Sequence, residues 1–184
     1  MHLTVFTPPT LAIVSLPEVK EQARVVDGDD DALLTGLRDA AVQWMDGWSG
    51  VLGRALATQT WDMHLPWFPE GAIVLPLGPV ASVVSIVYRN AAGAEVTVDP
   101  LTYRVAIAGG HGTVTPVASW PAAGDFADAV RVRWICGQAV ADIPHPIRLA
   151  ARVLAAHWYD QRGADGDVPD VVWSLIAPYR RRSL

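Results

Sequence analysis

The sequence contains a single cysteine, Cys136, among its 184 residues. One thiol cannot form a disulfide within the chain or a cysteine-cluster metal site, so a reducing compartment is expected. Acidic residues outnumber basic ones by 19 to 14, and the formal net charge is −5. Because a protein that grips DNA by neutralising phosphates needs a basic face, free nucleic acid is not an expected ligand.

Long apolar runs are also missing. Residues 1–16 lack a basic start and contain Pro8 and Pro9 in succession, so they predict neither a signal peptide nor a membrane span. No later run is long enough to cross a bilayer, and no membrane partner is expected. Hydrophobic residues nevertheless make up 51% of the chain, which is enough to bury a substantial core.

The residue patterns of common active sites are absent as well. The five histidines never occur at a metal-ligand spacing, and no nucleophile-elbow pattern or marked pair of carboxylates is present. Cys136 follows two arginines in a strand pattern, but no histidine is placed by sequence to act as its base, so a packed structural thiol is expected. The sequence therefore predicts no enzyme, no cofactor and no metal ion.

Two short motifs are better explained by structure than by ligand binding. The acidic run from Asp27 to Asp31 has carboxylates at alternate positions, but Ala32 and Arg38 occupy the places where a calcium loop needs glycine and a closing carboxylate. Capping of the next helix by these carboxylates is the favoured interpretation. The glycines at 109, 110 and 112 lead into a strand pattern, which predicts a tight hairpin rather than a phosphate loop.

A long helix over residues 31–52 is predicted to organise the fold. Its apolar stripe contains Leu33, Leu37, Ala40, Ala41, Trp44, Trp48, Val51 and Leu52. Trp44 and Trp48 lie one turn apart and are too large to leave uncovered, so the helix should pack on a broad partner surface. Gly50 and Gly53 provide the expected stop.

The remaining pattern predicts an α+β fold. Further helices are expected near residues 16–24, with Ser15 and Glu18 as a capping box, and near 146–162 and 169–177. Alternating and β-branched segments predict an inserted antiparallel β unit over about residues 57–136. The expected architecture is a single domain over residues 1–184, an antiparallel helical bundle with this β insertion.

Both ends of the chain suggest contacts with other molecules. Residues 1–14 are predicted to form an extended arm around Thr7, Pro8 and Pro9. Residues 178–184 place an aromatic and three cations after the last helix, and either a solvated tail or a docking segment is consistent with this. The supply of tryptophan beyond Trp44 and Trp48 exceeds what a small core usually needs, so some are expected at subunit contacts among Trp61, Trp67, Trp120, Trp134 and Trp173.

Several segments occur together in a familiar order. They are SLPEVK (15–20), DDDALL (29–34), GRALATQTW (53–61), IVLP (73–76), PVASV (79–83), DP with YRV (99–105), SWP (119–121), the stretch from IP to AHWY (143–159) and PYR (178–180). In this order and spacing, across nearly the whole chain, the sequence resembles the head-tail connector (adaptor) proteins of long-tailed bacteriophages and of related prophage-derived particles, the gene transfer agents. Cys136 and Gln138 are local departures from the family pattern.

The resemblance implies a structural virion protein at the head-tail junction, assembled in the cytoplasm of a bacterial host. It implies a homo-oligomeric ring, with twelve subunits expected, that binds a portal protein above and a stopper or tail-terminator protein below. Double-stranded DNA would pass through the lumen without sequence-specific binding. Contacts with the portal or a neighbouring subunit are expected at Thr7, Pro8, Pro9, Pro178, Tyr179, Arg180, Arg181 and Arg182.

Two other interpretations remain open from the sequence. One is a different component of the same particle, such as a stopper or tail-completion protein. The other is a cytoplasmic enzyme or small-ligand-binding domain with a pocket between the helices and the β unit. The second needs convergent polar groups, which the sequence does not mark out.

Overall fold

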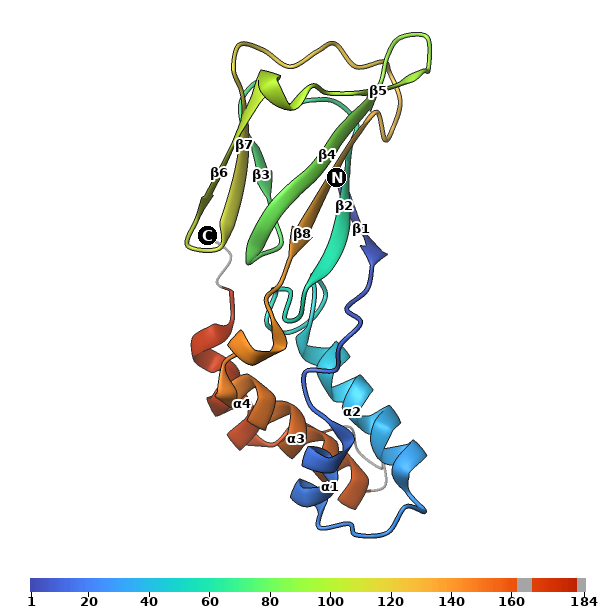
Figure 1. The fold of residues 1–184 in the computed structure, drawn as a ribbon, viewed down its shortest axis with the longest axis vertical. Helices are drawn as coiled ribbons and strands as arrows, with labels where there is room; N and C mark the ends of the chain where they lie inside the picture. The colour runs from blue at the N-terminus through green and yellow to red at the C-terminus, as the bar shows by residue number, and fades with distance from the viewer. Residues whose placement is uncertain (162–166, 182–184) are drawn as a thin grey trace. The chain divides into compact units, whose positions relative to one another are not determined.

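The computed structural model describes residues 1–161 and 167–181 and shows a mixed α/β protein that divides into two compact units (Figure 1). The β unit comprises Met1–Thr10 and Thr58–Gln138, and the helical unit comprises Leu11–Ala57 and Ala139–Leu184. Each unit is described by itself. Four α-helices and two antiparallel sheets occur in the described residues.

The larger sheet of the β unit has five antiparallel strands in the order β1-β2-β8-β4-β5. Their bounds are β1 (His2–Thr7), β2 (Gln59–Leu65), β4 (Val80–Arg89), β5 (Glu95–Thr97) and β8 (Val130–Cys136). The central strand β8 alternates as a half-buried strand should, because Val130, Val132, Trp134 and Cys136 are all fully buried. Trp134 also donates its indole N–H to the Leu77 carbonyl at 3.0 Å.

The smaller sheet has three strands in the order β3-β7-β6: β3 (Ile73–Leu75), β6 (Tyr103–Ala108) and β7 (His111–Pro116). Gly109 and Gly110 form the turn between β6 and β7 with φ of 57° and 80°. Positive φ at both central residues suits the twist of a two-residue hairpin, and glycine adopts it without steric cost. The predicted tight hairpin is confirmed.

Residues 2–7, predicted as part of an extended arm, form a strand of the larger sheet. β1 pairs antiparallel with β2, with His2 opposite His64 and Val5 opposite Trp61. An extended segment beside an open edge of β2 gains backbone hydrogen bonds that an isolated arm would lack. These residues are therefore extended, as predicted, and they pack within their own chain; Ile13 and Val14 are buried in the helical core.

The helical unit contains α1 (Leu16–Ala23), α2 (Asp31–Met45), α3 (His145–Asp160) and α4 (Asp170–Ile176), with short 3-10 turns η2 (Val140–Asp142) and η3 (Ala177–Tyr179). α3 contacts each of the other three helices, and its small face of Ala150, Ala151 and Ala155 is buried against them. The Ser15–Glu18 capping box at the start of α1 is confirmed. Residue 162, the expected end of α3, lies outside the described residues.

The long helix ends earlier than predicted, at Met45 rather than residue 52. The Asp46 carboxylate accepts the Leu56 N–H at 2.7 Å, and the Gly47 N–H bonds the Arg54 carbonyl at 2.9 Å, so the chain closes into a loop. This loop leaves Trp48 49% exposed, in contrast to its predicted place on the packed stripe. Leu33 is also exposed, because the buried face contains Leu34, Ala41 and Met45 instead.

The acidic residues at the start of α2 make side-chain contacts that differ from the predicted capping bonds. Asp30 occupies the N-cap position, but its side chain makes no capping hydrogen bond. Its carboxylate accepts the Tyr159 hydroxyl of α3 instead, and that bond raises the pKa of Tyr159. Asp31 pairs with Lys20 of α1 at 2.6 Å. The acidic run therefore ties α2 to its two neighbouring helices.

No helix in the described residues has the length and apolarity needed to cross a bilayer. Within residues 1–161 and 167–181, His, Cys, Asp and Glu side chains also do not gather in a group of three or more that could hold a metal ion.

Candidate interaction surfaces

The C-terminal residues predicted to contact other molecules lie against the helical unit. Pro178 and Tyr179 belong to η3, and Arg180 follows with its guanidinium 5.5 Å from the Trp173 ring centre. Arg180 also donates from Nε to the Val51 carbonyl at 3.3 Å. The first part of this segment is therefore tethered to its own subunit rather than forming a solvated tail.

A backbone contact continues this tether. The Arg181 N–H donates to the Leu52 carbonyl at 2.9 Å, beside Gly53, whose φ is 60°. The exit of α2, predicted as helix, thus forms the turn that holds the C-terminal segment. Pro178, Arg180 and Arg181 remain exposed, so their outer surfaces are open to another molecule, whereas Arg182 lies outside the described residues.

The N-terminal group belongs to the β unit. Thr7 is the last residue of β1, and Pro8 and Pro9 follow it before α1 begins. Thr7 and Pro8 are exposed and Pro9 is half-buried. Because this group and the C-terminal group belong to different units, each is a surface in its own right.

A guanidinium between an aromatic ring and a carboxylate fixes the end of β1. Arg133 of β8 donates from Nε and Nη2 to the two oxygens of Asp62, both at 2.7 Å. These hydrogen bonds raise the pKa of Arg133, and Phe6 of β1 lies over the guanidinium with its ring centre 3.2 Å away. The sequence did not predict this cluster, because residues 6, 62 and 133 are far apart in the chain and only strand pairing brings them together.

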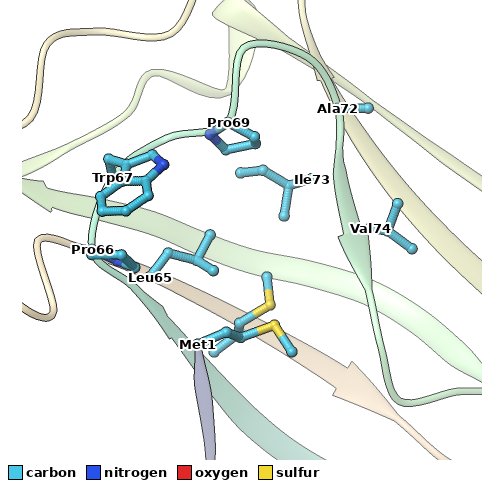
Figure 2. Close-up of a pocket in the computed structure, with 9 residues that line it drawn as sticks. Met1, Leu65, Pro66, Trp67, Pro69, Ala72, Ile73 and Val74 are labelled. Atoms are coloured by element: carbon cyan, nitrogen blue, oxygen red, sulfur yellow. The ribbon is translucent and has the colours of Figure 1, made fainter.

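The β unit also has an apolar hollow of about 460 Å³. It is lined by Met1, Met63, Leu65, Pro66, Trp67, Pro69, Ala72, Ile73 and Val74. Figure 2 shows these side chains coming from the start of β1, the end of β2, the β2–β3 loop and β3. None of the lining side chains is charged, so the hollow suits an apolar partner rather than a polar substrate.

Two large side chains that line this hollow are exposed: Trp67 of the β2–β3 loop at 69% and Val74 of β3 at 60%. The sequence had marked Trp67 as a tryptophan in excess of core needs. Its neighbour Phe68 is covered, stacked on Trp120 at 5.0 Å and edge-on to Tyr88 at 5.7 Å. The loop therefore inserts one aromatic into the unit and presents the next to solvent.

A second, polar hollow of about 30 Å³ lies beside β4 and β8 and is lined by charged side chains. Arg89 pairs with Asp128 at 3.6 Å, and Arg131 pairs with Glu95 at 3.5 Å. His64 borders it, and burial, followed by the nearby His2 ring, lowers the pKa of His64. These are paired, half-exposed groups, and their arrangement is that of a solvated face rather than of an acid–base pair.

Comparisons with known proteins identify the fold. No family model matches the chain, and no curated protein matches it. Among solved structures, a chain from the neck of an empty GTA particle computed with C6 symmetry superposes with a TM-score of 0.80 at 23% identity. Chains from the virion of a native gene transfer agent (GTA) particle and from the neck of a native GTA particle computed with C12 symmetry give 0.79 and 0.78, each at 22% identity.

Each of these alignments covers 100% of this chain and 97% of the other. The protein therefore has, over its whole length, the fold of chains found in GTA particles.

Proposed function

We propose that this protein is a structural component of the neck of a virion or gene transfer agent particle, where it acts as a head-tail connector (adaptor). The observation that carries the proposal is the full-length likeness to chains from GTA necks, with TM-scores of 0.80 and 0.78. In this proposal the two compact units together form one connector subunit, and the protein is not an enzyme.

The subunit assembles into a ring, for which twelve copies are the expected number. The C6 and C12 symmetries with which the similar necks were computed support a cyclic assembly. Cyclic rings use heterologous contacts, in which one surface of a subunit meets a different surface of the next. Exposed apolar surfaces such as the Trp67 hollow are suited to such contacts.

Portal protein above, a stopper or tail-terminator protein below, and DNA in the lumen complete the proposed surroundings. The net charge of −5 supports a lumen through which duplex DNA slides, since a basic lumen would hold phosphates. The exposed Pro178, Arg180 and Arg181 and the Thr7–Pro9 group are the proposed contacts with the portal or a neighbouring subunit, together with Tyr179 and Arg182.

Electron microscopy of the purified chain, alone and with the portal protein of its particle, tests the proposal. Rings that seat on the portal are expected, with a subunit count obtained from native mass spectrometry. A protein that forms rings or complexes without ever binding the portal would instead fit a stopper or tail-completion role.

The C-terminal contact has its own test. An Arg180→Glu substitution is expected to weaken portal binding by about tenfold, since it reverses a charge at the proposed contact. Arg24→Glu, the same change at an exposed position at the end of α1, is the matched control. Equal portal affinities for the two variants would contradict a role for this segment.

A further inference from the structure

β6 carries apolar residues on the core-facing side of its sheet that are much less covered than those of its neighbours. Along the small sheet, Val105 of β6 is opposite Val114 of β7, which is opposite Ile73 of β3. Residues in one such row point to the same face of a sheet. Val114 and Ile73 are buried, at 0% and 2% exposure, whereas Val105 is 41% exposed.

The next row on this face repeats the pattern. Ile107 of β6, Gly112 of β7 and Leu75 of β3 are aligned, and Leu75 is 1% exposed while Ile107 is 43% exposed. The core-facing side of the sheet thus extends onto β6, where its apolar side chains are only partly covered by the described residues. The one charged residue of the strand, Arg104, occupies the alternate face.

β6 also has an open hydrogen-bonding edge. Among the described residues it pairs only with β7, and its six residues contain no proline or lysine to block a further strand. Natural sheets usually protect such edges, so an unprotected apolar edge indicates a pairing partner. Six residues correspond to a strand of about 20 Å.

The opposite edge of the same sheet offers a matching surface. β3 likewise pairs only with β7 in the described part of the chain, and the apolar hollow with Trp67 and Val74 lies beside it. Figure 1 shows β6 and β1 at opposite sides of the β unit. Met1, which precedes β1, is one of the residues that line the hollow. One subunit therefore presents an apolar strand at one side and an uncharged apolar hollow at the other.

We propose that β6 of one subunit docks against β3 and the apolar hollow of the next copy of this chain, with Val105 and Ile107 directed into the hollow. This inference rests on the proposed ring. Two different surfaces on opposite sides of a subunit are what a closed heterologous ring requires, and strand addition at an edge supplies backbone hydrogen bonds while the side chains fill pockets. The small sheets of successive subunits then continue one another around the ring.

Cysteine crosslinking of assembled rings tests this contact directly. A Val105→Cys/Trp67→Cys double variant, which places one thiol on β6 and one at the exposed rim of the hollow, is oxidised after assembly and is expected to give a ladder of crosslinked multimers on a non-reducing gel. A mixture of the two single variants is expected to stop at dimers, because each subunit then carries only one half of the contact. Native Cys136 is fully buried and should not react in the folded protein.

A Val84→Cys/Trp67→Cys variant is the matched control. Val84 lies on β4 and is 52% exposed, so its thiol is accessible but lies on a different strand from the proposed contact. This variant is expected to give no ladder. Rings that form normally while the Val105/Trp67 pair gives no more ladder than the control would overturn the β6 contact.

A second variant separates assembly from folding. Ile107→Glu is expected to reduce ring formation at least tenfold while the circular dichroism spectrum and unfolding midpoint of the subunit stay unchanged. Ala106→Glu, on the alternate face of the same strand, should assemble more readily. Equal assembly of both variants, or crosslinking of Val105→Cys to another protein of the particle instead of to a second copy, would overturn the proposal. Failure of the wild-type chain to form any ring would instead contradict the proposed function.

Discussion

The Arg133 guanidinium donates both of its hydrogen bonds to the Asp62 carboxylate in parallel, each at 2.7 Å. The two residues are directly opposite each other on β8 and β2, so the sheet register itself sets the geometry. The Phe6 ring of β1 lies over the same guanidinium. This contact joins the edge strand β1 to the central strand β8. A planar, two-pronged pair of this kind is stronger than a single-contact surface ion pair.

Asp62→Ala is expected to lower the free energy of unfolding by about 2–3 kcal/mol, because it leaves a partly buried guanidinium without its acceptor. Asp128→Ala removes the partner of Arg89 in a half-exposed pair at 3.6 Å and should cost about 0–1 kcal/mol. Urea denaturation of both variants measures the difference. Equal costs would mean that the parallel geometry contributes nothing.

The capping box of α1 gives a second prediction. Ser15→Ala removes the hydroxyl that accepts the Glu18 N–H, and a loss of about 1 kcal/mol in unfolding free energy is expected. Ser174→Ala removes a hydroxyl that only bonds back to the Asp170 carbonyl within α4, so it should be nearly neutral. Thermal or urea unfolding of the pair checks this, and a neutral Ser15→Ala would argue against the cap.

The His2–His64 stack predicts pH dependence. The ring centres are 4.4 Å apart, and burial and then His2 lower the pKa of His64 below its ordinary 6.5, which outweighs the opposite effect of Asp62 and Asp128. The unfolded chain therefore binds more protons than the folded chain below pH 6.5. The contribution of His64 to the free energy of unfolding should be fully present above pH 6.5. It should decrease as the pH falls from 6.5 towards the lowered pKa.

Unfolding free energies at pH 7.5, 6.5 and 5.5 measure this effect. His64→Gln removes the titrating group, and its stability should change less across this range than that of the wild type. An identical slope for the variant would assign the dependence to other groups.

Close packing inside the β unit gives a fourth prediction. A Cβ at Gly112 would lie 2.8 Å from Leu75 Cδ1 and 2.9 Å from Val80 Cγ1. Gly112→Ala should therefore cost about 1–3 kcal/mol of unfolding free energy by overpacking. At Gly71 nothing lies within 4 Å of the same position, so Gly71→Ala should be close to neutral. Comparable unfolding midpoints for the two variants would contradict this packing argument.

Local sequence patterns predicted the antiparallel β unit and the tight hairpin within it. The alternation in residues 130–136 and the glycine pair at 109 and 110 reflect side-chain direction and backbone freedom, which are properties of a few adjacent residues. Ser15 and Glu18 predicted a helix start for the same reason. Each of these features depends on groups within a few positions of one another.

Errors arose where distant groups decided the outcome. The apolar pattern of the long helix continues past Met45, but the Asp46 bond to Leu56 and the Gly47 bond to Arg54 close a loop there instead. The N-terminal residues are extended as expected, yet only the open edge of β2, more than 50 positions away, makes them a strand. The Asp30 and Asp31 carboxylates would suit capping, but Tyr159 and Lys20 bond them instead.

The sequence by itself determined the mixed α/β composition, the strand periodicity, the hairpin turns and the acidic charge balance, because each follows from local stereochemistry or from counting. Only the tertiary structure decided which surfaces are open. Val105 and Ile107 have the pattern of buried residues, and nothing local distinguishes them from Val114. They are half-exposed because β6 is the last strand of its sheet, and strand order depends on contacts between residues far apart in the chain.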